Sequence, residues 1–314
     1  MPDETRKELP GGYRGRFAPS PTGPLHFGSL VAAVGSYLDA RAAGGEWLLR
    51  IEDIDAPRTT PGAGDGILRT LEGFGFEWDG EVVFQSRRLD LYHAALVSLQ
   101  LAGLVYPCAC SRSEVAAQAT RRSVDGGLLY PGTCRAGLRA GAAARAWRLR
   151  VPDREFVFQD RVQGEARQNL EREVGDFVLL RADGQYAYQL AVVADDAAQG
   201  VNAVVRGVDL LDSTARQIWL QQCLGLPAPS HAHLPVAVNP AGEKLSKQTR
   251  APAIDPAQGV GLLARALRFL GQPVPAEAEG MALADFWRWA IGTWKLSRVP
   301  AVRAILAIPE DRRQ

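Results

Sequence analysis

The stretch Arg16-Phe17-Ala18-Pro19-Ser20-Pro21-Thr22-Gly23-Pro24-Leu25-His26-Phe27-Gly28-Ser29 joins an apolar strand to a proline-rich loop and a helix start. Proline fixes φ and delays helix formation, so we expect a helix from near Phe27 that stops at Gly44-Gly45. The free amides and the positive dipole end of that helix favour phosphate, and His26 can donate a hydrogen bond to it. Gly28 leaves room for a nucleotide beside the backbone. The stretch predicts a nucleotide site, although a strand, loop and helix with one buried histidine would look similar.

A second motif, Lys244-Leu245-Ser246-Lys247, stands out because lysine is rare in this chain. Only Lys7 and Lys295 accompany its two lysines, among 36 basic residues. Lysine carries a compact charge on a flexible stem, which suits a loop that follows a moving phosphate. Pro240, Gly242 and Pro252 flank the motif without apolar periodicity and indicate a mobile loop. A solvated basic turn is the alternative.

Together the two motifs resemble the signature pair of class I aminoacyl-tRNA synthetases, His-Ile-Gly-His and Lys-Met-Ser-Lys-Ser. Ser29 replaces the second histidine and Gln248 the final serine. Ser29 keeps a hydrogen-bond donor but carries no charge. Further segments extend the resemblance to the glutamyl branch over nearly all of residues 14–255: Arg50-Ile51-Glu52-Asp53-Ile54-Asp55, Gln85-Ser86-Arg87-Arg88, Tyr92, Tyr106-Pro107-Cys108, Tyr186 to Val193, Asp195-Asp196, Val205 to Asp209, Ser213 to Gln217 and His233-Leu234-Pro235.

A glutamate pocket needs at least two cations for its carboxylates and an anion for its ammonium group. Arg16 and Arg206, each at a strand end, can form forked hydrogen bonds to carboxylates, and Glu52 can take the ammonium. Ligands bind at the carboxyl ends of parallel strands, where these residues are expected. Isolated surface ion pairs are the alternative for each. The resemblance implies a glutamate site that comprises Arg16, Phe17, Ala18, Pro19, Ser20, Glu52, Tyr188 and Arg206.

The resemblance also implies the reaction, an in-line attack of the glutamate carboxylate on the α-phosphate of ATP with Mg²⁺. The protein would align two anions and neutralise the charge that develops on pyrophosphate. That task falls chiefly to Lys247, with Lys244 and His26. The implied ATP site comprises His26, Gly28, Ser29, Lys244 and Lys247.

Composition and pattern indicate an α/β fold with one large domain. The chain has 314 residues, 46% of them hydrophobic, and a net charge of +1. No apolar run approaches the roughly 20 residues of a membrane helix, and the charged N-terminus lacks a signal-peptide core, so we infer a cytoplasmic protein without membrane association. We expect strands at 15–18, 47–51, 188–193 and 201–206, short strands at 147–151 and 155–158, and helices at 89–103, 213–224, 260–270 and 282–294.

These elements predict a Rossmann-like parallel-sheet catalytic domain of residues 1–107 and 174–252. Residues 108–173 form an arginine- and glycine-rich insertion, which we expect to hold zinc and contact the nucleic acid. Residues 253–314 form a short helical C-terminal region. We expect a monomer.

Three of the four cysteines, Cys108, Cys110 and Cys134, lie in the insertion. Clustered thiols of a reducing compartment ligate metal more often than they form disulfides. Cys-x-Cys is tighter than the usual zinc knuckle, and no histidine lies nearby. Resemblance to the glutamyl-queuosine branch implies one structural Zn²⁺ with Tyr130 as its fourth ligand. Free cysteines are the alternative, and Cys223 is most simply a core residue.

The same branch sets the expected partners. Only 67 residues follow Lys247, whereas glutamyl-tRNA synthetases continue into anticodon-binding domains. The resemblance implies transfer of glutamate to queuosine in the anticodon loop of tRNA(Asp), with a minimal glutamyl-tRNA synthetase that charges a 3′ end as the alternative. A catalytically silent zinc-containing RNA-binding module is a third reading. Residues 108–154 hold nine arginines and three acids, a local charge of +6 that suits a phosphate backbone, or a solvated arginine-rich face.

Overall fold

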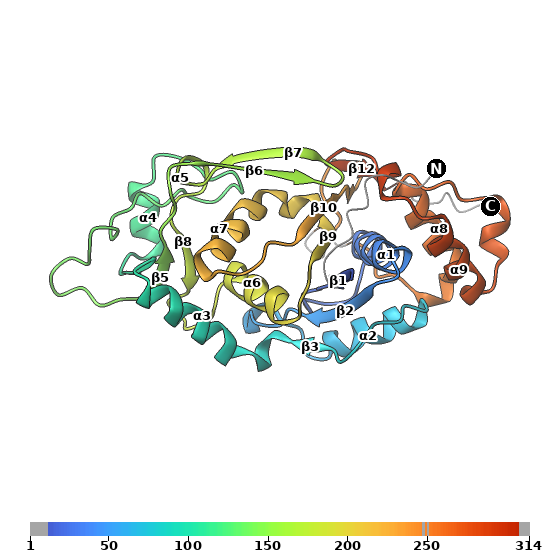
Figure 1. The fold of residues 1–314 in the computed structure, drawn as a ribbon, viewed down its shortest axis with the longest axis horizontal. Helices are drawn as coiled ribbons and strands as arrows, with labels where there is room; N and C mark the ends of the chain where they lie inside the picture. Colours follow the sequence, from blue (N-terminus) through green and yellow to red (C-terminus); the bar gives the residue numbers. More distant parts are fainter. Residues whose placement is uncertain (1–11, 247–248, 250, 308–314) are drawn as a thin grey trace.

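The computed structural model describes residues 12–246, 249 and 251–307. Its centre is an α/β domain built on parallel strands (Figure 1). One sheet has the order β1 (Arg14–Phe17), β2 (Glu46–Ile51), β3 (Val83–Phe84), and a second has β7 (Gly164–Asn169), β6 (Glu155–Asp160), β10 (Ser230–Leu234), β9 (Ala203–Gly207). The Asn202 amide donates to the Arg14 carbonyl oxygen at 3.1 Å, which joins the two sheets beside β1 and β9.

Helix α1 (Phe27–Ala42) begins and ends as expected. His26 is its N-cap residue, and Ala43 is its C-cap residue before Gly44, which has a φ of 67°. Helices α8 (Gly259–Phe269) and α9 (Leu283–Thr293) pack against it. Phe27 meets Phe269 edge-on, and Trp287 contacts Tyr37. The C-terminal helices therefore complete the hydrophobic core around α1.

A second core lies between the central sheet and the left end of the molecule in Figure 1. There α3 (Leu89–Leu101), α6 (Tyr188–Ala198) and α7 (Thr214–Leu224) pack together. An antiparallel sheet of β4 (Val105–Cys108), β5 (Ala146–Leu149) and β8 (Phe177–Leu180) borders them. The predicted helices at 89–103, 213–224, 260–270 and 282–294 are confirmed to within two residues at each end.

The strand expected at 188–193 is wrong, because these residues form the first part of α6. Every residue from Gln189 to Asp196 is buried, so the segment has no polar face to reveal a helical period. A short apolar run that is buried on all sides looks the same in sequence whether it is a strand or a helix. The helix matters for the site, because it presents Tyr188 at one end and Asp195 and Asp196 at the other.

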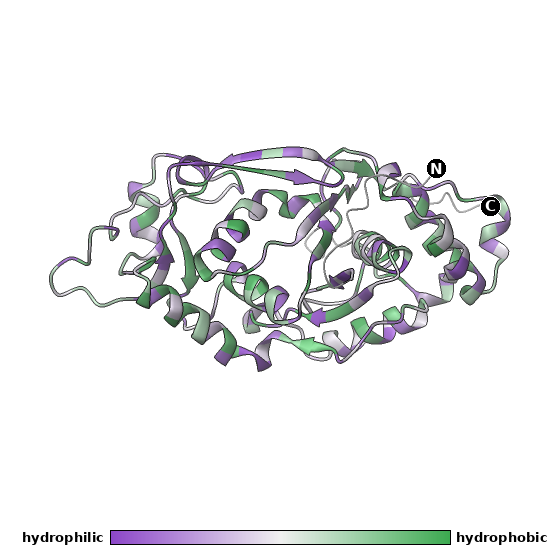
Figure 2. Ribbon diagram, in the orientation of Figure 1, coloured by the Kyte–Doolittle hydropathy of each residue, from purple (hydrophilic) through white to green (hydrophobic). Residues whose placement is uncertain are grey.

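The remaining elements connect and cover these layers. Strand β12 (Ala304–Leu306) pairs in parallel with β11 (Val236–Val238), so the C-terminal region is not entirely helical. Figure 2 shows β7 as largely hydrophilic, which suits an exposed edge strand. The other segments are η1 (Ala56–Arg58), α2 (Ala63–Gly73), η2 (Gln85–Arg87), α4 (Arg112–Gln118), α5 (Leu170–Glu173), η3 (Val208–Ser213), η4 (Pro256–Gln258), η5 (Ala276–Gly280) and η6 (Leu296–Arg298).

Candidate active site

A cavity of about 580 Å³ lies at the carboxyl ends of β1, β2 and β9. All described residues predicted for the glutamate and ATP sites line it. They are Arg16, Phe17, Ala18, Pro19, Ser20, His26, Gly28, Ser29, Glu52, Tyr188, Arg206 and Lys244. Lys247 and Gln248 lie outside the described residues. The structure therefore brings together side chains that are almost 230 residues apart in sequence.

The start of α1 forms one wall of this cavity. The carbonyl oxygen of His26 accepts from the Ser29 and Leu30 amides, and its ring Nδ1 accepts from the Ser29 amide at 3.3 Å. Because Nδ1 is the acceptor, the proton of a neutral ring lies on Nε2. A Cβ atom at Gly28 would lie 3.2 Å from the His26 ring, so glycine permits this close approach.

The lysine motif lies over the same helix start. The Leu245 amide donates to the Ala237 carbonyl oxygen at 2.8 Å, and the Leu245 carbonyl oxygen lies near Gly28. The Lys244 Nζ atom is 2.5 Å from Asp209 Oδ2, and both side chains line the cavity. Lys244 therefore forms an exposed ion pair in this structure, and its flexible side chain would allow the ammonium group to move away from Asp209.

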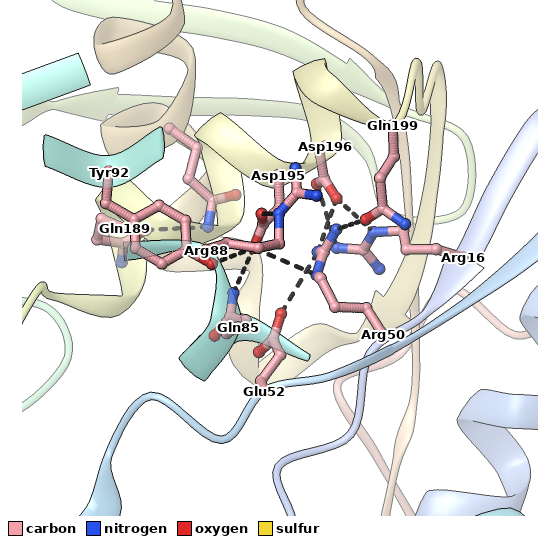
Figure 3. Close-up of polar contacts among 11 residues, drawn as sticks. Arg16, Arg50, Glu52, Gln85, Arg88, Tyr92, Gln189, Asp195, Asp196 and Gln199 are labelled. Atoms are coloured by element: carbon pink, nitrogen blue, oxygen red, sulfur yellow. Dashed lines mark hydrogen bonds and ion pairs between the residues drawn. The ribbon is translucent and has the colours of Figure 1, made fainter. Parts of the chain in front are cut away.

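Beneath the cavity floor lies a buried network of alternating charge (Figure 3). Arg50, which is fully buried, lies 2.7 Å from Asp196 and 3.4 Å from Glu52. Arg16 Nε lies 3.2 Å from the same Asp196 carboxylate. Burial raises the pKa of Asp196, but Arg16 and Arg50 outweigh it and leave the pKa below its usual range. Glu52 differs, because burial raises its pKa more than Arg50 and Arg16 lower it.

Asp195 is the second hub of this network. Its carboxylate accepts from Gln85 Nε2 and from the Tyr92 hydroxyl, both at 2.8 Å, and from Arg88 Nε at 2.6 Å. These contacts tie α6 to α3 and to the segment after β3 (Figure 3). The sequence motifs that contain these residues and Arg50 predicted no contact among them. Asp195 and Asp196 directly follow an apolar run, and buried charged groups must be paired. This pattern was the available signal that the two acids have buried partners.

Arg206 lies in β9 and is 5% exposed. Its Nε donates to His233 Nε2 at 3.0 Å, and one terminal nitrogen donates to Thr214 Oγ1 at 2.9 Å. Among the described residues no carboxylate pairs with it. Burial and the nearby Arg16 lower its pKa. The cavity therefore contains a buried guanidinium group that neutral side chains orient, and no ion pair with a described residue offsets its charge.

Three cysteine sulfurs and one phenol converge outside this cavity. The Sγ atoms of Cys108, Cys110 and Cys134 all lie within 4.8 Å of one another. The Tyr130 hydroxyl lies 3.4 Å from Cys108 Sγ and 3.7 Å from Cys110 Sγ. The Cys134 amide donates to that hydroxyl at 2.8 Å, which holds the ring in place. These four side chains, all predicted as ligands, are grouped closely enough to hold one metal ion.

Comparison with known proteins identifies the family to which the chain belongs. Residues 13–268 match the family model of the catalytic domain of class I tRNA synthetases for E and Q. The chain belongs to this family. Its catalytic type is therefore that of a class I tRNA synthetase ligase.

Relatives within the synthetase family narrow the comparison. The chain is 65% identical over 294 residues to a protein of Dechloromonas aromatica named "Glutamyl-Q tRNA(Asp) synthetase", covering 94% of this chain and 98% of that protein. A protein of the same name in Chromobacterium violaceum is 61% identical over 92% of this chain and 96% of its own length.

Among solved structures, a glutamate tRNA ligase from Elizabethkingia meningosepticum in complex with its amino acid has a TM-score of 0.77 and 26% identity. The alignment covers 93% of this chain and 66% of that one. In the part of the chain that the structure describes, no helix combines the length and apolar character needed to cross a membrane.

Proposed function

We propose that the protein activates L-glutamate with ATP and transfers the glutamyl group to queuosine in the anticodon loop of tRNA(Asp). The observation that carries the amino-acid part is the buried guanidinium of Arg206, which forms no ion pair with a carboxylate of the described residues. A buried cation without a counter-ion is unfavourable, so an anionic ligand would relieve it. The names of the closely similar relatives support the queuosine acceptor.

Glutamate fits the other charges of the cavity. One carboxylate of glutamate would bind Arg206. The other would bind Arg16, whose side chain is held in place by Asp196. The ammonium group would lie against Glu52. Burial raises the pKa of Glu52, and a cation beside it would lower that pKa and favour the ionised carboxylate. Tyr188 and Ser20 add hydroxyl groups at the cavity wall.

ATP would bind with its phosphates at the start of α1, where Ser29 and the helix amides face the cavity. A glutamate carboxylate oxygen attacks the α-phosphorus, the bond to the β-phosphate oxygen breaks, and pyrophosphate leaves. His26, Lys244 and Lys247 would stabilise the charge that develops there, with Mg²⁺ bound to the phosphates. A queuosine hydroxyl then attacks the glutamyl carbonyl carbon, loses its proton and displaces AMP.

The RNA would approach across the arginine-rich insertion. A second cavity of about 980 Å³ is lined there by Arg112, Arg145, Arg148 and Arg181, among other residues. Arg181 is also 3.5 Å from Asp55, which lines the first cavity. The two cavities are thus neighbours, and a phosphate backbone on the basic side could present a base to the other.

We further propose a structural Zn²⁺ bound by Cys108, Cys110, Tyr130 and Cys134. In a tetrahedral site with Zn–S bonds of about 2.3 Å, sulfurs are roughly 3.8 Å apart. The Cys110 and Cys134 sulfurs are 3.6 Å apart, and the phenol oxygen is at comparable distances. The ion would cross-link β4 to the loop around Tyr130 and supply no reaction step.

The experiment that tests the function follows radiolabelled glutamate onto purified RNA. We expect ATP-dependent transfer to queuosine-containing tRNA(Asp), and none to tRNA(Asp) that lacks queuosine or to tRNA(Glu). We also expect glutamate-dependent pyrophosphate exchange without RNA, because protein groups alone complete the amino-acid site. Label on the 3′ end of tRNA(Glu) would favour the minimal glutamyl-tRNA synthetase, and absence of any exchange would favour a silent RNA-binding module.

A further inference from the structure

Behind Arg206 lies a row of buried side chains from three neighbouring strands. His233 of β10 is the register partner of Arg206 in β9, and Asp160 ends β6 on the other side of β10. The Asp160 Oδ2 atom is 2.6 Å from His233 Nδ1, and His233 Nε2 is 3.0 Å from Arg206 Nε. The exposed fractions are 4% for Asp160 and 0% for His233, so water does not compete for these contacts.

The proton positions in this row follow from the donors available. An arginine Nε–H can only donate, so His233 Nε2 must accept. The ring proton then lies on Nδ1 and is donated to Asp160. Asp160 Oδ1 accepts from the amides of Val162, Gln163 and His233, which fixes the carboxylate and leaves Oδ2 for the imidazole.

Because the acceptor of the Arg206 Nε–H is a neutral imidazole, it affects ligand binding differently from a carboxylate. An acid beside Arg206 would neutralise its charge and weaken its attraction for a ligand carboxylate, whereas neutral His233 orients the guanidinium and leaves its charge intact. Burial lowers the pKa of His233, in agreement with a neutral ring. Another guanidinium nitrogen donates to Thr214 Oγ1 and to the Leu210 carbonyl oxygen. Only Nη1 lacks a partner among the described residues.

We propose that His233, held in its Nδ1–H form by Asp160, is a positioning residue that directs Arg206 Nη1 toward a carboxylate of the amino-acid substrate. The proposal rests on the proposed function for the identity of that substrate. It assigns to β6, a strand within residues 108–173 that pairs with β10, a direct role in shaping the amino-acid pocket.

The test compares two substitutions in the full-length protein by glutamate-dependent pyrophosphate exchange. His233→Gln can place its amide oxygen near the position of Nε2 and keep an acceptor for Arg206. His233→Asn reaches only the position of Nδ1. We expect His233→Asn to raise KM for glutamate roughly tenfold or more, the effect of losing one hydrogen bond to a charged group. KM for ATP should not change, and His233→Gln should restore most of the glutamate affinity.

His231→Asn is the matched control, because His231 is buried and stacks on His233 at 6.1 Å but makes no side-chain hydrogen bond in the described structure. Equal KM increases in His231→Asn and His233→Asn, or an unchanged KM in His233→Asn, would overturn the proposal. A wild-type protein without any exchange would instead refute the proposed function.

A second measurement is made on the wild-type protein, and a variant serves only to assign the signal. In protein labelled with ¹⁵N-histidine, long-range ¹⁵N–¹H correlation spectra distinguish the two neutral tautomers of the four histidines. The signal missing in His233→Gln identifies His233. We expect the Nδ1–H tautomer at neutral pH, and a proton on Nε2 or a doubly protonated ring would refute the positioning mechanism.

Discussion

Arg206 and Glu52 illustrate, residue by residue, how this cavity treats charge. Arg206 donates its hydrogen bonds to neutral acceptors and forms no ion pair among the described residues, while Glu52 lies beside Arg50 in a setting where burial raises the pKa of Glu52. A dicarboxylic amino acid would supply what each lacks, a carboxylate for Arg206 and an ammonium group for Glu52. The unliganded cavity is therefore electrostatically complementary to the proposed substrate.

The signature lysine offers a test of transition-state stabilisation. Lys247→Ala should lower the rate of pyrophosphate exchange on the order of a hundredfold, because it removes the positive charge that we propose stabilises the leaving pyrophosphate. Glutamate binding, measured by calorimetry, should change little. Lys295→Ala, at an exposed residue of the C-terminal region, serves as the control. Equal losses in rate and in glutamate affinity would contradict the assigned role.

Arg50 offers a test of the buried network. Arg50→Met leaves Asp195 and Asp196 without their central cation, and breaking a buried ion pair costs about 3–5 kcal/mol of unfolding free energy. The pKa of Asp196 is lowered in the folded protein, so its ionisation stabilises the fold above its unfolded pKa of about 3.9 and this contribution fades at lower pH.

Without Arg50, burial should raise the pKa of Asp196, and the stability difference from wild type should shrink as the pH falls toward and below 4. Urea unfolding at pH 7 and near pH 4 measures both effects. Arg288→Met removes an exposed pair with Asp285 and should cost less than about 1 kcal/mol. A loss as small in Arg50→Met would show that the network does not depend on its central arginine.

Among the elements, helices with one exposed face were predictable from their periodicity, and the buried helix α6 was not. Helices α3, α7, α8 and α9 follow from apolar periodicity and terminal signals, and α1 follows from its prolines and glycines. Helix α6 was mistaken for a strand because burial on all sides removes the periodic signal. The contacts of Arg50 with Asp195 and Asp196 could not be predicted from the sequence either, because they join segments about 145 residues apart.

The cysteine cluster is an element-scale prediction, because it joins β4 to the loop at Tyr130 and Cys134. Elemental analysis of the purified protein should find about one zinc per chain, the content of a single tetrahedral site. Cys110→Ser and Tyr130→Phe should each reduce it, whereas Cys223→Ser, which changes a cysteine of α7, should not. A metal-free wild-type protein would end the proposal, and unchanged zinc in Tyr130→Phe would leave another group as the fourth ligand.

In the whole molecule, the parallel α/β core was predicted from strands that alternate with helices, and the pairing of β12 with β11 was not. Only three residues of each strand pair, which is too short a run for a sequence signal. Arg16, Glu52 and Arg206 converge because β1, β2 and β9 end on the same side of the two adjoining sheets, a consequence of topology that sequence spacing supports. The partners that hold those residues, such as His233 behind Arg206, depend on register across three strands.

The arginine-rich end of the molecule, around α4 and β5 in Figure 1, lies opposite the C-terminal helices α8 and α9 and carries the last prediction. The Arg112 and Arg145 side chains line the second cavity, are exposed, and contact no described residue through a hydrogen bond or ion pair. Arg121 and Arg122, by contrast, donate to the carbonyl oxygens of Arg172 and Gly126 and help to shape their own loop.

Reversal of Arg112 and Arg145 to glutamate should therefore test RNA contact with little disturbance of the fold, whereas reversal of Arg121 and Arg122 would combine both effects. We expect Arg112→Glu with Arg145→Glu to weaken transfer to queuosine-containing tRNA(Asp) steeply and to reduce the salt dependence of RNA binding, because phosphate contacts release counter-ions. Pyrophosphate exchange should continue at the wild-type rate, since neither arginine lines the first cavity. The control, Arg288→Glu with Arg298→Glu, makes the same change in net charge at the opposite end. If that control impaired transfer equally, overall charge rather than the insertion surface would govern RNA binding.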